Sequence, residues 1–144
     1  MKVVAKNARV RAYLCGPING RSDSDCKDWR AWADERLLCT TINPMDRDYR
    51  GRETELGIIT TIVEGDKEDV ASADFILVYF DQPSIGTAME CLFAWQLGKS
   101  VIVTNVSGKV LSPWLAYHSH AVYTDLGVAV EHINQEVLRQ SFGD

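Results

Sequence analysis

The stretch that decides the fold is residues 74–104, which read DFILVYFDQPSIGTAMECLFAWQLGKSVIVT. The continuous apolar run at 74–80 is typical of a strand that is buried on both faces of a parallel sheet. Residues 87–97 predict a helix, and residues 100–104 predict the next strand. A strand, a helix and a strand in this order form a βαβ unit, so the stretch predicts parallel pairing.

The rest of the chain repeats this alternation in both directions. Further strands are predicted at 9–15, 39–43 and 121–124, and further helices at 54–71, at 126–139 and after the capping residues Ser22, Asp23 and Ser24. In that first helix an amphipathic stripe of Cys26, Trp29, Ala33 and Leu37 is predicted to face the core, and so is Trp32. We therefore predict a single domain over 1–144: an α/β, three-layer, flavodoxin-like or Rossmann-like sandwich with a five-stranded parallel sheet.

Composition narrows the range of partners. The chain has 144 residues, 20 of them acidic and 15 basic, for a net charge of −5. This balance gives no reason to expect a nucleic acid polymer or an anionic membrane as partner. With no signal-peptide core and no apolar run of about 18 residues, we expect a cytoplasmic protein. Its four cysteines form no CxxC pair and are expected to be free thiols. Any anion must then be held at a local site.

Ligands of such sheets bind outside the carboxyl ends of the strands. The loops expected there are residues 16–22, 43–51 and 81–86. The last of them leads into a helix, where Ser84, Gly86 and Thr87 suit a phosphate or a hydroxyl group. A simple helix cap is the alternative interpretation of the same residues.

The most informative side chain is Glu90, the one ionisable residue in an otherwise apolar predicted helix. A buried carboxylate without a partner is costly, and such groups mark functional sites. A capping role or an arginine pair is the structural alternative. Glu90 is predicted to lean back toward the 84–86 loop, where a nucleophile attacking a sugar carbon would be needed. Asp66 precedes a strand and Tyr13 ends one; alone, neither is decisive.

No cofactor or metal is expected. The chain lacks GxGxxG and GxxxxGK[ST], and the acidic pair of a phosphoacceptor receiver domain is missing after the first strand. His118 and His120 have no third ligand at a suitable spacing. For Tyr117, His118 and His120 we expect a role in lining a pocket or contacting a second subunit.

Three segments together resemble the nucleoside 2-deoxyribosyltransferase superfamily: YLCGPING at 13–20, GDKEDVASADFILVYF at 65–80 and QPSIGTAMECLFAWQLGK at 82–99. The resemblance covers about residues 10–125. It implies a flavodoxin-like domain that cleaves the N-glycosidic bond of nucleosides or nucleotides. It also implies that Glu90 is the nucleophile, that Tyr13 positions it, and that Asp66 is a second acid near the base.

Within the superfamily, Ser84 stands where the transferases usually have an aspartate. The segment QPS-x-G-x-x-x-E is similar to that of the 2′-deoxynucleoside 5′-monophosphate N-hydrolases, and SGKVLSP at 107–113 is similar to a segment whose serine, here Ser112, reaches a neighbouring subunit's phosphate. A homodimer with shared sites is thereby implied. The chain departs from these hydrolases at Pro17 and Asn19, where they carry serine and arginine; Arg21 is the candidate replacement.

The expected reaction is hydrolysis of (2′-deoxy)nucleoside 5′-monophosphates, with a small-molecule nucleotide or nucleoside as partner. The phosphate is expected on Gly16, Pro17, Ile18, Asn19, Gly20, Arg21, Ser84, Gly86, Thr87 and a partner's Ser112. Base exchange between 2′-deoxynucleosides is the enzymatic alternative. A nucleotide-sensing module without turnover is the other.

Overall fold

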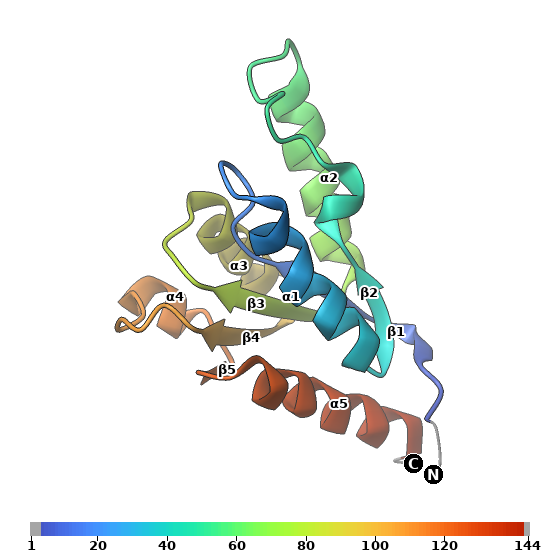
Figure 1. The fold of residues 1–144 in the computed structure, drawn as a ribbon. Helices are drawn as coiled ribbons and strands as arrows, with labels where there is room; N and C mark the ends of the chain where they lie inside the picture. The colour runs from blue at the N-terminus through green and yellow to red at the C-terminus, as the bar shows by residue number, and fades with distance from the viewer. Residues whose placement is uncertain (1–3, 143–144) are drawn as a thin grey trace.

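A computed structural model gives the structure of residues 4–142 (Figure 1). Five strands form one parallel sheet in the order β2-β1-β3-β4-β5, which confirms the predicted sheet. Their bounds are β1 Asn7–Cys15, β2 Cys39–Ile42, β3 Phe75–Phe80, β4 Ser100–Asn105 and β5 Ala121–Tyr123. The chain reverses its direction of winding between β1 and β3. A crevice at the carboxyl ends of these two strands is where such sheets bind ligands.

Helices cover both faces of the sheet, so the predicted three layers are confirmed (Figure 1). One core cluster joins the sheet to α1, Asp23–Arg36, and α5, Leu126–Phe142. The other joins it to α2, Ile58–Ser72, α3, Ile85–Gln96, and the short α4, Pro113–Tyr117. Side chains alternate along β1, so Leu14 belongs to the first cluster while Tyr13 and Cys15 belong to the second. Tyr13 therefore faces α2 and α3.

Several helix boundaries differ from the predicted ones. The helix predicted from residue 54 begins at Ile58, because Gly57 adopts a left-handed φ of 77° and residues 49–58 form turns. The helix predicted from residue 87 begins at Ile85, because Ser84 is extended and caps it. The 3₁₀ helix η1, Pro44–Arg47, lies in a segment that was expected to be a loop, and α4 lies in a segment for which no element was predicted.

Two expectations about burial were wrong. Trp32 is 36% exposed and packs under Arg36, whose Cζ lies 4.0 Å from its ring centroid, so only Trp29 faces the core. Helix α3 is apolar nearly all round yet is not enclosed, with Ile85 82% and Met89 65% exposed. It lies in the outer layer against α2 and the sheet, and no further layer covers it. Within the described residues, no helix is long and apolar enough to cross a bilayer.

Candidate active site

Glu90 lies in the second turn of α3 and reaches the carboxyl end of β1. The Tyr13 hydroxyl donates a hydrogen bond to Glu90 Oε2. The Cys15 Sγ lies 3.9 Å from Glu90 Oε1. Both partners point from β1 toward α3, because they are two residues apart on one strand. β1 and α3 thus hold the carboxylate beside the carboxyl end of β1.

Burial dominates the chemistry of this carboxyl group. It raises the pKa of Glu90 to about 7, with a further increase from the Asp66 charge; the Tyr13 hydrogen bond and the charge of Arg30 oppose the rise. The pKa of Tyr13 is raised far above its usual value by burial and by the Glu90 charge. Tyr13 is therefore a neutral donor at every physiological pH. Near neutrality Glu90 exists in both protonation states.

Asp66 approaches the same space from α2. Burial raises the pKa of its carboxyl group, and the nearby Asp69 raises it further, whereas Arg47 lowers it. The guanidinium of Arg47 lies 3.8 Å from Asp66 Oδ1 and forms an ion pair with Asp69. A Cβ at Gly65 would come within 3.3 Å of that guanidinium, so glycine lets Arg47 lie against α2.

Asp66 and Glu90 line one cavity of about 350 Å³ between α2 and α3. Its other lining residues are mostly apolar: Val63, Lys67, Val70, Gly86, Met89, Leu92, Phe93 and Gln96. A volume of this order accommodates a small organic ligand. Apolar walls also explain why burial raises the pKa of both carboxyl groups.

The predicted phosphate loop, residues 16–21, follows β1 directly. Gly16 and Pro17 are buried, whereas Asn19 and Gly20 are exposed. The loop closes with a turn in which the Arg21 amide donates to the Ile18 carbonyl at 3.0 Å, and Gly20 has a φ of 72°. A Cβ at Gly16 would lie 3.0 Å from both Trp29 Cζ2 and the Tyr79 carbonyl oxygen, so only glycine fits without displacement.

Arg21, the expected cation of this loop, already has two acidic neighbours. It forms an ion pair with Asp81, and its Nε lies 3.6 Å from Asp25 Oδ2. Asp81 Oδ1 is buried without a hydrogen-bond partner. The positive charge of Arg21 is therefore compensated by protein carboxylates.

Ser84, Gly86 and Thr87 lie at the start of α3 as predicted, but the Thr87 amide takes part in the helix cap. Ser84 caps the helix, and its Oγ accepts from the Thr87 amide at 3.3 Å. Thr87 is buried, and because its amide is occupied it is a poor anion donor. Gly86 is exposed and lines the cavity. Ser112 is exposed just before α4 and does not line the cavity of its own subunit.

The structure places three side chains near the site that were not predicted from the sequence: Arg30, Arg47 and Lys67. The first two are arginines in polar segments, where sequence gives no sign of a buried or bridging role. Lys67 follows Asp66 in the chain, and its Nζ lies 5.3 Å from the ring centroid of Phe93. Its position next to Asp66 in the sequence was the one feature that could have indicated a place near the site.

The histidine pair packs around Trp95. His120 lies 4.6 Å from that indole ring, centroid to centroid, and its Nδ1 accepts from the Val101 amide at 3.0 Å. His118 Nδ1 lies 2.6 Å from the Trp114 carbonyl oxygen. In each of these two histidines, Nδ1 forms a hydrogen bond with a backbone group. Residues 4–142 contain no group of three or more metal-ligating side chains.

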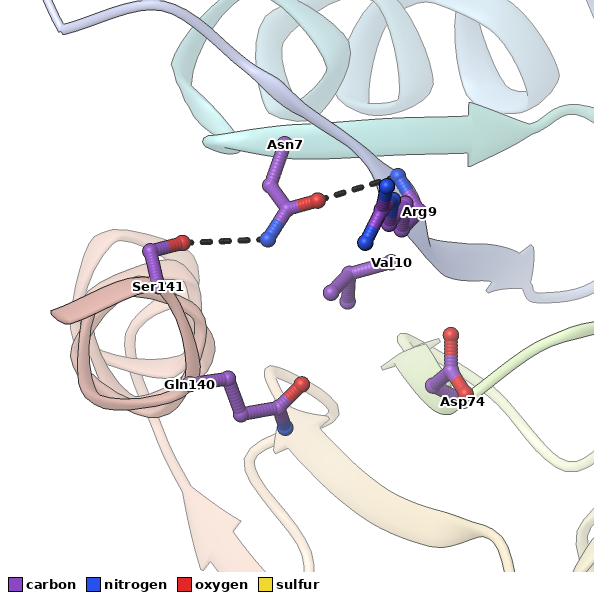
Figure 2. A pocket seen from close by; sticks show the side chains of 6 residues that line it. All are labelled: Asn7, Arg9, Val10, Asp74, Gln140 and Ser141. Carbon is purple, nitrogen blue, oxygen red and sulfur yellow. Dashed lines mark hydrogen bonds between the residues drawn. The ribbon is translucent and has the colours of Figure 1, made fainter. Parts of the chain in front are cut away.

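A second pocket, of about 480 Å³, lies at the opposite edge of the sheet (Figure 2). There Asn7 donates to Ser141 Oγ at 3.0 Å and accepts from the Arg9 amide at 3.0 Å, which ties β1 to the end of α5. Arg9, Val10, Asp74 and Gln140 complete its lining. None of the predicted site residues lies in it.

Comparison with solved structures gives the same fold. The chain is similar to the 2-deoxyribosyltransferase of Bacillus psychrosaccharolyticus, with a TM-score of 0.70 and 21% identity over 89% of this chain and 96% of that one. The fold is shared. The 2-deoxyribosyltransferase of Leishmania mexicana gives a TM-score of 0.57 at 17% identity, covering 88% and 97%. The CMP N-glycosidase of Clostridium botulinum gives 0.54 at 14%, covering 86% and 98%. No protein-family model and no curated protein sequence matches the chain.

Proposed function

We propose that the protein is an N-glycosidase that cleaves the bond between base and sugar in (2′-deoxy)nucleoside 5′-monophosphates. The observation that carries this proposal is that the buried Tyr13 donates a hydrogen bond to the partly buried Glu90, whose carboxylate lines one cavity together with the partly buried Asp66. Two carboxyl groups with separate environments are the usual equipment for glycoside cleavage. Structural neighbours whose names include a CMP N-glycosidase and 2-deoxyribosyltransferases support the same class of reaction.

The reaction proceeds in two steps. In the first, the ionised Glu90 attacks C1′, the C1′–N bond breaks with its electron pair passing to the base, and Asp66 supplies a proton to the departing base. The product is an ester between the sugar and Glu90. In the second step water attacks C1′, its proton passes to Asp66, and the Glu90 carboxylate is released with the sugar 5-phosphate. The hydrogen bond from Tyr13 keeps the attacking carboxylate oriented.

The phosphate is assigned to the 16–21 loop and the start of α3. The positive end of a helix dipole favours an anion there, and Gly86 lets its backbone approach a ligand closely. The Ser84 Oγ accepts from Thr87, which leaves its proton free to donate to a phosphate oxygen. In a homodimer, Ser112 of the second subunit would add a donor.

Base exchange between 2′-deoxynucleosides is the second candidate function, and one observation favours it. The charge of Arg21 is compensated by Asp25 and Asp81, so no free cation of the first loop awaits a phosphate. A neutral 5′-hydroxyl group requires none. In this case a second base, rather than water, attacks the glycosyl ester.

One experiment tests the class of reaction and the branch together. The purified protein is incubated with each of the deoxynucleoside and ribonucleoside monophosphates, and separately with deoxyadenosine plus cytosine, and the products are separated by liquid chromatography. Free base from monophosphates alone supports the hydrolase, and deoxycytidine from the second mixture supports the transferase. Glu90→Gln is the matched control and is expected to be inactive. Equal turnover by Glu90→Gln would refute the proposal.

A further inference from the structure

Arg30 is the largest fully buried side chain of the described residues, with no exposed surface. From α1 it donates three hydrogen bonds, all to backbone carbonyl oxygens. Nε lies 3.1 Å from the Leu14 oxygen, Nη2 3.0 Å from the Gly16 oxygen and Nη1 2.7 Å from the Cys26 oxygen. Two of these carbonyls flank Cys15, so Arg30 fixes the carboxyl end of β1 directly after Tyr13.

The charge of Arg30 lacks a salt-bridge partner. All three of its acceptors are neutral, and none of the ion pairs of residues 4–142 includes it. Arginine stays protonated even when buried, and an unpaired buried charge is costly. Three carbonyl acceptors need three N–H donors, which one guanidinium supplies and the two N–H groups of a glutamine amide do not. The guanidinium also lies over the Trp29 ring, with Cζ 4.6 Å from the ring centroid, so its charge is met by a π face and by carbonyl dipoles.

We propose that Arg30 is a positioning residue that holds the carboxyl end of β1 in place for the Tyr13–Glu90 pair. Arg30 touches neither the substrate nor the reacting atoms. It acts through the strand that carries Tyr13 and Cys15. This inference rests on the proposed function of Glu90.

The groups that face Glu90 from each neighbouring element decide the direction of the effect. Tyr13 and Cys15 from β1 are neutral donors, and Asp66 from α2 is acidic. Lys67 of α2 also lines the cavity but extends over Phe93. Arg30 is the cation whose charge lowers the pKa of Glu90. Without it, burial and Asp66 remain, so less of the nucleophile is ionised at neutral pH.

Two substitutions separate charge from geometry. Arg30→Gln removes the charge and keeps an amide donor for the carbonyl groups, whereas Arg30→Lys keeps the charge and loses the planar fork. Arg36→Gln, at the exposed end of the same helix, is the control. The Glu90 pKa is measured without turnover, by ¹³C NMR of the glutamate carboxyl groups, with Glu90→Gln to assign the signal. Circular dichroism reports folding, and the pH profile of kcat/KM is recorded in parallel.

We expect Arg30→Gln to raise the Glu90 pKa by about one unit and to move the acidic limb of the kcat/KM profile by the same amount. We expect Arg30→Lys to leave that pKa at its native value and to lower kcat. An unchanged Glu90 pKa in folded Arg30→Gln overturns the inference. If only Arg30→Lys folds, a raised Glu90 pKa with native kcat overturns it equally. Turnover by Glu90→Gln would refute the proposed function, while the NMR titration would still decide the role of Arg30.

Discussion

Replacing Glu90 by glutamine should stabilise the protein at alkaline pH and much less at acidic pH. Folding raises the pKa of Glu90 from 4.5 to about 7, so the folded state binds the proton more tightly than the unfolded state. The ionised carboxylate therefore destabilises the fold increasingly as the pH rises from about 4.5 to about 7. At 1.36 kcal/mol per pKa unit, the cost is about 3 kcal/mol at pH 8 and about 1 kcal/mol at pH 5. Glutamine keeps the shape and an acceptor for Tyr13 but carries no charge.

Urea denaturation of the native protein and of Glu90→Gln at pH 5 and pH 8 measures this effect. The stability gained by the substitution should be about 2–3 kcal/mol larger at pH 8, which corresponds to a difference of about 8 °C in the Tm shift. Glu64→Gln is the control, because Glu64 is an exposed glutamate on α2 and its substitution should act alike at both pH values. An equal effect of Glu90→Gln at both pH values would refute the conclusion that folding raises the pKa of the Glu90 carboxyl group.

The remaining predictions concern the surroundings of Glu90. Tyr13→Phe removes the hydroxyl group that donates to the Glu90 carboxylate, so kcat/KM should fall about 10- to 100-fold and the acidic limb of its pH profile should shift to higher pH. Unaltered kinetics would exclude the positioning role. Asp81→Asn removes one of the two carboxylates beside Arg21, so KM for monophosphates should fall about tenfold while KM for nucleosides stays constant. A parallel change in both KM values would place the phosphate elsewhere. Gly16→Ala should lower the free energy of unfolding, measured by urea denaturation, by about 1–3 kcal/mol. Gly86→Ala should lower it far less, because a Cβ at this position meets nothing within 4 Å. Similar losses for the two substitutions would contradict the tight packing at the first loop.

The order of the elements was predictable because short apolar runs alternate with longer segments of helical pattern. The run at 75–80 is fully apolar, and its first four residues are buried in the sheet. The start of α2 was not predictable in the same way, because Gly57 and the turns before it interrupt a sequence that looks helical. The exposure of one apolar face of α3 was not predictable either, because composition does not show which side of a helix is left uncovered.

Within the site, sequence identified the residues whose chemistry is unusual for their surroundings. Glu90 stands out in an apolar helix, and the structure brings it to Tyr13 and to the cavity of Asp66. Sequence alone could not show that the Thr87 amide donates to Ser84 in the helix cap, because this hydrogen bond depends on the Ser84 rotamer. Nor could it show that Arg30 is buried, since arginine on a polar helix is usually exposed.

Mass spectrometry can detect the proposed covalent bond between Glu90 and the sugar. The protein is mixed with a 2′-fluorinated arabinonucleoside 5′-monophosphate, which slows release of the ester, then quenched with acid and digested with trypsin. We expect a sugar-phosphate adduct on the peptide of residues 68–99, at Glu90, and none in Glu90→Gln. Release of base from the natural substrate with no adduct on that peptide, or with an adduct at another residue, would contradict the account.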